Sequence, residues 1–339
     1  MTAAIGMIVN PMSGRDVRRL AARASNMTHE AKRDLVARAA VGADTAGVTD
    51  IYVMQEPFRI ASAALEHMDL DARVHVLTHQ PSNDAGDTET AVVRYLQAGC
   101  RTLISLGGDG TNRALVRALM GLGEAANDVH LIALSTGTNN VFPVLVEPTI
   151  AGLVAGYHAT GRLAEAEELR QRVKVLHVRI GKVRDVGLID AVLLRGDHVG
   201  NLLPFDPQRL ARLLLTRADP SAIGTSSIGG LLEVVSAADD EGLLVEMGAG
   251  MRFKAPLSPG LFREVEVQSA TRIGFGVSVR FQGPGVLALD GDRDHKLGED
   301  MHASITLARD GPWLLNVERV MRWAVAQGII GIRHSVATQ

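Results

Sequence analysis

Short apolar runs alternate with longer helical stretches through the first 160 residues, and this alternation constrains the fold more than any other feature. The apolar runs are short enough to be buried strands and lie at residues 5–9, 51–54, 74–77, 103–106 and 131–134. Strands and helices that alternate at this spacing predict parallel strands joined by right-handed crossovers. We therefore expect an open parallel-sheet α/β domain over residues 1–160, with any ligand at the carboxyl ends of its strands.

A different pattern begins at about residue 173, where apolar and polar residues alternate with a period of two. Segments of this kind lie at residues 173–180, 252–254, 265–267, 276–281 and 303–307, separated by Gly, Pro and Asp-Gly turn signals. Many short strands with such turns predict a β-sandwich-like domain, which we expect over residues 161–339. The apolar spacing near residues 207–217 predicts a helical insertion, and a closing C-terminal helix is expected at residues 317–326.

Composition narrows the functional classes. The 339 residues suit two domains, and a formal net charge of −3 with only 4% aromatic residues argues against nucleic acid as a partner. The single cysteine, Cys100, excludes an internal disulfide framework or a cysteine zinc site, and we expect it to be buried and inert rather than reactive. The sequence begins without a basic, apolar leader and has no uninterrupted apolar span, so we expect a cytoplasmic protein without a membrane span.

The most informative string is Gly-Gly-Asp-Gly-Thr at residues 107–111, which follows a buried run and precedes a helical pattern. Glycines allow successive backbone N–H groups to converge on an anion, and the helix N-terminus behind them adds a favourable field. Asp109 in the middle of the string could coordinate a metal or accept a hydroxyl proton. An Asp that only caps the helix is the structural alternative. The chain lacks the Gly-x-x-x-x-Gly-Lys-Ser/Thr pattern of P-loop NTPases.

With this loop and an early Asn-Pro-Met-Ser-Gly turn at residues 10–14, the chain resembles the superfamily of NAD kinases and diacylglycerol or sphingoid kinases. Further similar segments are Ser-Thr-Gly-Thr-Asn-Asn-Val-Phe-Pro at 135–143, the Gly/Thr/Ser-rich stretch at 224–230 and Leu-Asp-Gly-Asp at 289–292. Gly-Arg-Asp at 14–16 and the 135–143 string are most similar to the acetoin catabolism protein X branch of that superfamily. The resemblance implies a homo-oligomeric kinase that uses ATP and Mg²⁺ to phosphorylate a hydroxyl of NAD(H) or a related acceptor, with a link to acetoin catabolism.

The resemblance also implies roles for individual residues. Asp109 would be the catalytic carboxylate, either activating the acceptor hydroxyl or positioning Mg²⁺. Acceptor binding would fall to Asp190, Thr225, Ser226, Ser227 and Asp290. Nucleotide and phosphate binding would fall to Asn10, Ser13, Gly14, Arg15, Gly107, Gly108, Gly110, Thr111, Thr136, Gly137, Thr138, Asn139 and Asn140.

One departure from the NAD kinase pattern keeps other functions open. Ile189 precedes Asp190 where NAD kinases have Asn, so half of a ribose clamp is missing. A lipid or small-molecule alcohol kinase and a non-catalytic nucleotide-binding regulator are the alternatives. Arg15 and Arg113 are candidate phosphate-binding cations, although most helix arginines are merely solvated. The Asp-Gly pair at 290–291 also suits a plain hairpin turn, and the hydroxyls at 225–227 also suit a polar loop.

Overall fold

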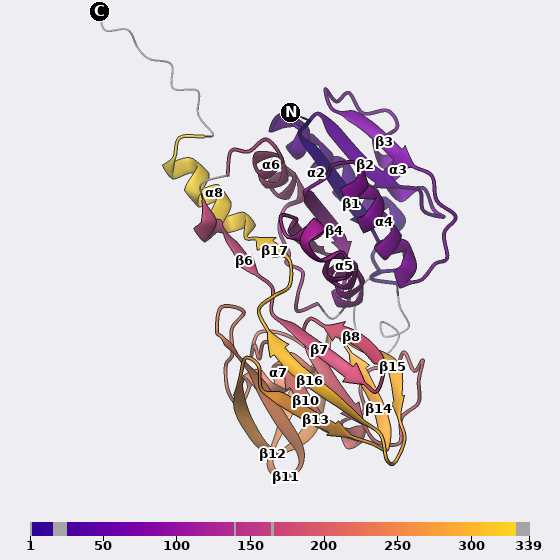
Figure 1. Ribbon diagram of the computed structural model, residues 1–339, viewed down its shortest axis with the longest axis vertical. Helices are drawn as coiled ribbons and strands as arrows, with labels where there is room; N and C mark the ends of the chain where they lie inside the picture. Colours follow the sequence, from indigo (N-terminus) through magenta and orange to yellow (C-terminus); the bar gives the residue numbers. More distant parts are fainter. Residues whose placement is uncertain (1, 16–25, 139, 164–165, 330–339) are drawn as a thin grey trace, which may run out of the picture.

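The computed structural model describes residues 2–15, 26–138, 140–163 and 166–329, which form two domains arranged one above the other (Figure 1). The upper domain is built on a parallel sheet with helices on both faces, and the lower domain consists mainly of antiparallel strands. The expected fold class, an α/β domain followed by a β-sandwich-like domain, is confirmed. The sequence after the Asn-Pro-Met-Ser-Gly turn also predicts an Arg-rich helical segment from Asp16, and residues 16–25 lie outside the described part of the chain.

The first domain contains a seven-stranded sheet in which five parallel strands come from the five predicted apolar runs. In sheet order the strands are β3 (Arg73–Leu77), β2 (Asp50–Met54), β1 (Ala4–Val9), β4 (Thr102–Gly107), β5 (His130–Ser135), β17 (Trp313–Leu315) and β6 (Arg170–Arg172). The central strands β1 and β4 are buried on both faces, which explains why their sequences are continuously apolar.

Helices cover both faces of this sheet, so two separate cores form. One face packs against α2 (His29–Thr45), α3 (Ile60–Leu65), α6 (Pro148–Ala159) and α8 (Val317–Ala326), and the other against α4 (Ala85–Gln97) and α5 (Asp109–Gly121). Because right-handed crossovers place successive helices in this way, all the loops that follow β1 to β5 meet at one edge of the sheet.

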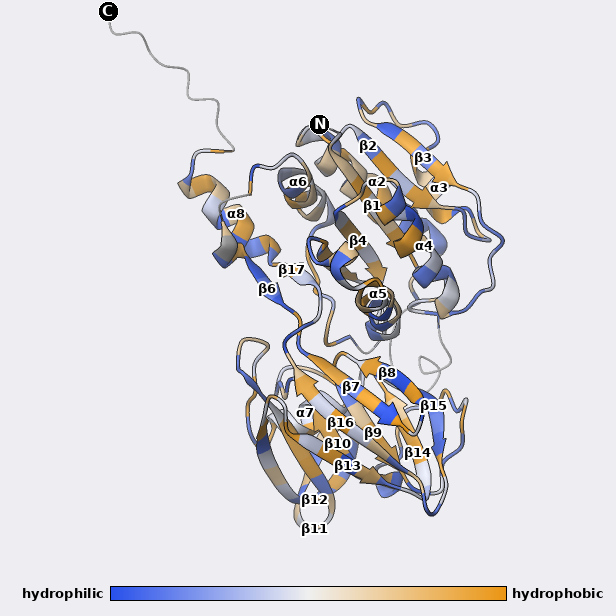
Figure 2. Cartoon of the chain, viewed as in Figure 1, coloured by the Kyte–Doolittle hydropathy of each residue, from blue (hydrophilic) through white to orange (hydrophobic). Residues whose placement is uncertain are grey.

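The second domain is a sandwich of two antiparallel sheets with a shared core that includes Leu176, Leu193, Phe281 and Ile305. One sheet has the order β12 (Leu261–Gly274), β11 (Glu241–Ser258), β10 (Leu210–Leu215), β9 (Asp190–Leu194), β14 (Gly285–Leu289) and β15 (Asp292–Leu297). The other has the order β13 (Ser278–Gln282), β16 (His302–Ala308), β7 (Val175–Ile180) and β8 (Val183–Gly187). In Figure 2, orange and blue segments alternate along strands such as β7 and β8, as expected for half-buried strands.

The expected helical insertion at residues 207–217 is wrong. A single helical turn covers Pro207–Arg209, and the chain then forms β10, a central strand between β9 and β11. Leu213 and Leu215 pack into the core beneath α7 (Thr225–Gly230), whereas Leu214 packs into the core between the two sheets. A strand buried on both faces loses its polar–apolar alternation, and that loss led to the wrong prediction.

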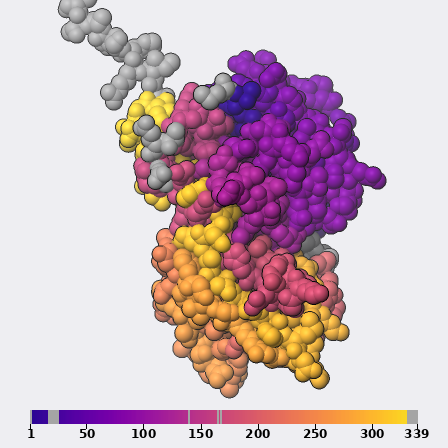
Figure 3. Space-filling model, viewed as in Figure 1, coloured from indigo at the N-terminus to yellow at the C-terminus, as the bar shows by residue number. Residues whose placement is uncertain are grey.

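The C-terminal segment returns to the first domain. After β16 the chain adds β17 to the parallel sheet beside β5, and α8 packs into the core of the first domain through Val317, Val320 and Ala324. Figure 3 shows the yellow C-terminal segment lying against both domains. The expected C-terminal helix is therefore present, but it closes the first domain instead of the second.

Helices α2 and α6 approach each other closely enough to exclude side chains at their contact. A Cβ atom on Gly42 would lie 1.9 Å from the carbonyl oxygen of Thr149, and one on Gly152 would lie 1.9 Å from that of Ala39.

We expect Gly42→Ala to lower the free energy of unfolding by at least about 1–3 kcal/mol, because the two backbones must separate. Urea denaturation measures this, with Gly121→Ala as the control. Gly121 ends α5 with open space around it, so its replacement should be neutral or stabilising. Equal losses in both variants would contradict the contact.

No helix in the described part of the chain is long and apolar enough to cross a membrane.

Candidate functional site

A pocket of about 600 Å³ lies where the carboxyl ends of the parallel strands face the second domain. Its lining brings together most of the residues that the resemblance assigned to nucleotide binding, together with Asp109 and Asp290. The predicted residues that line it are Asn10, Ser13, Gly14, Gly108, Asp109, Gly110, Thr111, Gly137, Thr138, Asn140 and Asp290. We call this cavity the large pocket.

Side-chain hydrogen bonds tie the loops after β1, β4 and β5 to one another. The amide of Asn10 donates to Thr111 Oγ1 at 2.7 Å, and its Oδ1 accepts the backbone N–H groups of Met12 and Ser13. The hydroxyls of Ser13 and Thr136 share a hydrogen bond of 2.7 Å. These contacts hold three loops from distant parts of the sequence in one fixed arrangement, as a rigid binding site requires.

Lys32 of α2 supports the first loop from behind, and no sequence signal pointed to it. Its side chain is fully buried, and its Nζ donates to the carbonyl oxygens of Asn10 at 2.8 Å and Pro11 at 2.6 Å. A buried ammonium needs such partners. A lysine in a predicted helix is normally solvated, so only the packing of α2 beneath the loop reveals this role.

Glycines let the backbone of the loop at residues 107–111 approach its neighbours. A Cβ on Gly137 would lie 2.9 Å from the Cα of Gly108, so the loops after β4 and β5 are in backbone contact. A Cβ on Gly107 would clash with Thr111 at 2.4 Å. Gly110 faces the second domain, and a Cβ on Gly110 would lie 3.0 Å from Asp292 Oδ2. Gly108, Gly110 and Gly137 therefore present backbone to the large pocket.

Asp109 is the first residue of α5 and is 8% exposed. Its Oδ1 accepts the backbone N–H of Phe142 at 2.8 Å, and Oδ1 and Oδ2 both accept that of Val141, at 3.2 and 3.1 Å. Burial raises the pKa of Asp109 to about 7, against the lowering effect of these N–H groups. A carboxylate with a pKa near neutral pH is suited to proton transfer.

Arg217, which follows β10 in the second domain, holds the segment that contacts Asp109. Its guanidinium donates to the carbonyl oxygen of Val141 at 3.0 Å and lies 5.7 Å from the centre of the Phe142 ring. Burial lowers the pKa of Arg217, and the nearby carboxylate of Asp109 counteracts this effect. The second domain thus contributes to positioning the carboxylate at the start of α5.

A cavity of about 50 Å³, here called the small pocket, lies beside the large one. Asp109 and Asp290 line both pockets and so form part of a common wall. Thr225 donates its hydroxyl to the carboxylate of Asp190, and both residues line the small pocket. Asp290 accepts the backbone N–H groups of Leu188, Ile189 and Asp190. Burial and the neighbouring Asp190 raise the pKa of Asp290.

Some predicted residues line neither pocket. Arg15 contacts His29, with 2.5 Å between Nη1 and Nε2. Gly107 and Thr136 are packed behind the loops. Ser226 donates to the carbonyl oxygen of Arg217, and Ser227 donates to that of Gly224. Asn139 lies outside the described residues.

The large pocket also contains residues that carried no sequence motif. They lie on the loops after β2 and β3 and in the first turn of α4, and include Gln55, Glu56, His79, Asn83, Asp84, Asp87 and Thr88. The predicted position of these two strands was the only available signal, because the loops that follow parallel strands meet at one edge. Leu202 and Asp292 join the lining from the second domain.

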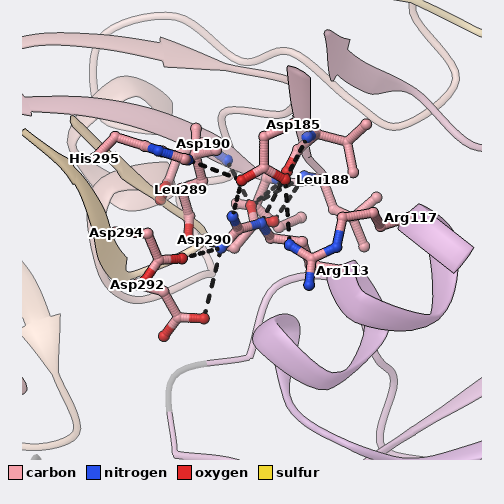
Figure 4. A network of polar contacts seen from close by, with 12 residues as sticks. Arg113, Arg117, Asp185, Leu188, Asp190, Leu289, Asp290, Asp292, Asp294 and His295 are labelled. Atoms are coloured by element: carbon pink, nitrogen blue, oxygen red, sulfur yellow. Dashed lines mark hydrogen bonds and ion pairs between the residues drawn. The ribbon is translucent and has the colours of Figure 1, made fainter. Parts of the chain in front are cut away.

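Arg113 of α5 binds the second domain instead of the pocket. Its 3% exposed side chain donates to Asp185 at 2.6 Å, to Asp294 at 3.2 Å and to the carbonyl oxygens of Val186 and Leu289. Figure 4 shows this guanidinium among the carboxylates of the second domain. Burial opposes ionisation of Asp185, but the hydrogen bond from His295 and the charge of Arg113 hold the pKa of Asp185 well below its usual range. Arg113 is therefore an interdomain clamp and no longer a candidate phosphate ligand.

Residues 57–172 match the family model described as diacylglycerol kinase catalytic domain, and this span includes the Gly-Gly-Asp-Gly-Thr string at residues 107–111. The parallel-sheet domain is therefore similar, over these residues, to a kinase catalytic domain. Residues 174–310 match the C-terminal domain of acetoin catabolism protein X. Acetoin catabolism protein X of Cupriavidus necator is 33% identical to the chain over 345 residues, covering 94% of this chain and 92% of that protein. The chain belongs to the acetoin catabolism protein X family.

Two solved structures give more distant matches. An NAD kinase from Archaeoglobus fulgidus, solved in complex with ATP, covers 84% of this chain and all of its own, with 14% identity and a TM-score of 0.42. A diacylglycerol kinase from Bacillus anthracis covers 92% of this chain and 96% of its own, with 13% identity and a TM-score of 0.45.

Proposed function

We propose that this protein transfers a phosphoryl group from a nucleotide bound in the large pocket to the hydroxyl group of an acceptor. The observation that carries the proposal is the position of Asp109, which begins α5 beside the phosphate loop and lines both pockets. A donor in one cavity and an acceptor in the other would meet at this carboxylate. Phosphoryl transfer depends mainly on such positioning and on stabilisation of the transferred charge.

The large pocket suits the donor because of its size and its backbone donors. Its volume of about 600 Å³ lies within the range of cofactor sites. The loop at 107–111 and the N-terminus of α5 direct N–H groups toward an anion. Six carboxylate residues line the pocket, and none of its described lining residues is Lys or Arg. A triphosphate therefore needs an accompanying cation to offset the repulsion.

Asp292 is the carboxylate best suited to hold Mg²⁺. It lines the large pocket opposite Gly110, and its side chain is 40% exposed. No described group of three or more His, Cys, Asp or Glu residues could hold a metal on its own. This fits Mg²⁺, which is commonly bound by one or two carboxylates together with substrate phosphates. Burial raises the pKa of Asp109 to about 7, so we assign that residue to proton transfer. When bound, Mg²⁺ would neutralise charge on the phosphates.

In the proposed step, the acceptor oxygen forms a bond to the γ-phosphorus of ATP while the bond from that phosphorus to the β–γ bridging oxygen breaks. ADP leaves, and the acceptor becomes a phosphate ester. The hydroxyl proton passes to the carboxylate of Asp109. The N–H groups of Val141 and Phe142 fix this carboxylate in position, and Arg217 fixes the Val141 carbonyl.

The rate of transfer should rise with pH through about 7 and then level off. Only deprotonated Asp109 can accept the hydroxyl proton, and burial places its pKa near that value. Measurement of kcat/KM between pH 5.5 and 9 checks this prediction, because kcat/KM reports the pKa of the base in the free enzyme. A rate that falls steadily across this interval would contradict the role of Asp109 as the base.

Nucleotide binding can be tested without knowing the acceptor. We expect millimolar Mg²⁺-ATP to raise the melting temperature, because a ligand at 100 times its dissociation constant adds about 2.7 kcal/mol to stability. An unchanged melting temperature with ATP, NAD⁺ and NADH would refute a nucleotide site. A raised melting temperature without any phosphate transfer would favour the nucleotide-binding regulator.

NAD(H) is the acceptor that the NAD kinase resemblance favours, and it defines the first arm of an acceptor screen. A lipid alcohol defines the second arm, supported by the match to the diacylglycerol kinase catalytic domain. The exposed apolar residues Leu202 and Leu203 border the two pockets. Purified protein with Mg²⁺-ATP and each acceptor, followed by ³¹P NMR, identifies the phosphorylated product. The relative from Cupriavidus necator is named acetoin catabolism protein X, which supports a link to acetoin catabolism.

A further inference from the structure

His79 lines the large pocket, but the proposed phosphoryl transfer gives it no part. It lies on the loop after β3, and its ring Nε2 is 2.9 Å from Asp87 Oδ1. The two side chains are 20% and 26% exposed. A histidine held against a carboxylate in the wall of a pocket has one ring nitrogen engaged and the other available to a ligand.

Asp87, in the first turn of α4, fixes the tautomer of His79. Its Oδ1 also accepts the backbone N–H of Ser82 at 2.7 Å, and its Oδ2 accepts that of Asn83 at 2.8 Å. Burial opposes ionisation of Asp87, but these N–H groups and the His79 ring lower the pKa of Asp87 below its usual value. An ionised carboxylate only accepts hydrogen bonds, so Nε2 of His79 carries the hydrogen atom. In the neutral ring Nδ1 is then an acceptor, and no residue in the described part of the chain donates to it.

The wall that carries His79 lies far from the loop at residues 107–111. In the sheet order β4, β1, β2, β3, the loops after β4 and β3 are three strand spacings apart, or about 14 Å (Figure 1). A triphosphate chain alone is shorter than this span. A nucleotide with its phosphates on the loop at 107–111 would therefore extend its sugar and base toward His79.

Charge and hydrophobicity also distinguish this end of the large pocket, where residues 54–61 and 79–91 contribute the lining. The carboxylates of Glu56, Asp84 and Asp87 belong to these segments and would repel phosphate groups. The apolar lining residues of the same segments are Met54, Pro57, Ala61, Ala85 and Ala91. An apolar surface with a few fixed polar groups suits a flat, neutral base.

We propose that His79 binds the base of the phosphoryl donor and selects a purine with an amino group at position 6, as in adenine. This inference rests on the proposed function and names the base that its donor carries. The amino group donates a hydrogen bond to Nδ1. A purine with a carbonyl group at position 6 places an oxygen against Nδ1, so that two acceptors face each other and neither is satisfied. Asp87 is the positioning residue that keeps Nδ1 an acceptor.

The test compares dissociation constants of the full chain for Mg²⁺-ATP and for Mg²⁺-inosine triphosphate, whose base carries the carbonyl group at position 6. Isothermal titration calorimetry at about pH 8, where an ordinary histidine is neutral, measures both. We expect ATP to bind about tenfold or more tightly, the scale of one mismatched hydrogen bond. Equal affinities would overturn the inference. Mg²⁺-2′-deoxyATP is the third ligand and should bind as tightly as ATP. A larger loss with 2′-deoxyATP than with inosine triphosphate would place the ribose at His79 and so contradict the assignment.

Variants separate base selection from damage to the pocket. His79→Phe keeps a ring without the acceptor, so it should abolish the preference for ATP over inosine triphosphate and leave binding of Mg²⁺-tripolyphosphate, which has no base, unchanged. His67→Phe is the control, because His67 is exposed and does not line the large pocket.

Asp87→Asn supplies an independent variant. Its amide can donate to Nε2 and move the ring hydrogen to Nδ1, so the preference should fall here as well. A preference that survives in both His79→Phe and Asp87→Asn would refute the role of His79. If the wild-type protein binds neither Mg²⁺-ATP nor Mg²⁺-tripolyphosphate, the proposed function itself fails.

Discussion

Asp109→Asn is expected to lower phosphoryl transfer by about 100-fold or more, the usual scale for a positioned acid or base. The amide is similar in shape to the carboxylate, and its oxygen can still accept the N–H of Phe142. It cannot take up the acceptor proton. The variant should also lose the rise in rate near pH 7. Single-turnover rates with saturating Mg²⁺-ATP measure the effect on the chemical step.

Stability separates this catalytic effect from damage to the fold. Burial raises the pKa of Asp109 above its value in the unfolded chain, so its contribution to stability is present at low pH and is lost as pH rises through about 7. Asp109→Asn removes that dependence and should be as stable as the parent, or more stable, above pH 7. An unchanged transfer rate in a folded variant would exclude Asp109 from the chemistry.

Arg113→Met is expected to lower the free energy of unfolding by about 3–5 kcal/mol, because it leaves the buried carboxylate of Asp185 without its closest cation. The loss should be greatest at neutral and higher pH, where Asp185 is ionised, and should shrink as acid protonates this carboxylate. Arg113 lies on α5, the helix that begins at Asp109, so the same change should also loosen the second domain against the phosphate loop. Urea denaturation at pH 7 and at about pH 3.5, below the ordinary pKa of an aspartate, measures the first effect.

Two further variants isolate the ion pair. Arg322→Met breaks an exposed pair with Glu318 in α8 and should cost only about 0.3–0.5 kcal/mol. Combining Arg113→Met with Asp185→Asn should cost less than the sum of the single changes, because the second change removes the unpaired charge. Strict additivity would mean that the two side chains do not interact.

Local sequence patterns were sufficient wherever neighbouring residues control the structure. The apolar runs that became β1, β2, β3, β4 and β5 are confirmed. Strands β1, β2, β4 and β5 lie inside the parallel sheet and must be apolar on both faces, whereas β3 is the partly exposed edge strand. The same rule explains the error at β10, whose continuous leucines are buried on both faces of an antiparallel sheet. Hydrophobic spacing reports how deeply a segment is buried, and it distinguishes strand from helix only when one face remains in water.

The residues at the pocket also fall into two groups, those that a sequence motif reveals and those that only tertiary packing reveals. Gly108, Asp109 and Asn140 lie on motifs that the sequence displays, and the structure brings them to the large pocket. Lys32 and Arg217 belong to no motif, and they become supporting residues only because α2 and the second domain pack against the loops.

By itself, the sequence determined the five apolar runs that form parallel strands in the first domain, the glycine loop before α5 and the family of the chain, because these depend on residues close together along the backbone. Only the tertiary structure decided that Arg113 clamps the domains, that α8 returns to the first core and that Asp109 is shared between two cavities. Each of these depends on contacts between distant segments, and burial by those segments gives the side chains their charge partners and their altered pKa values.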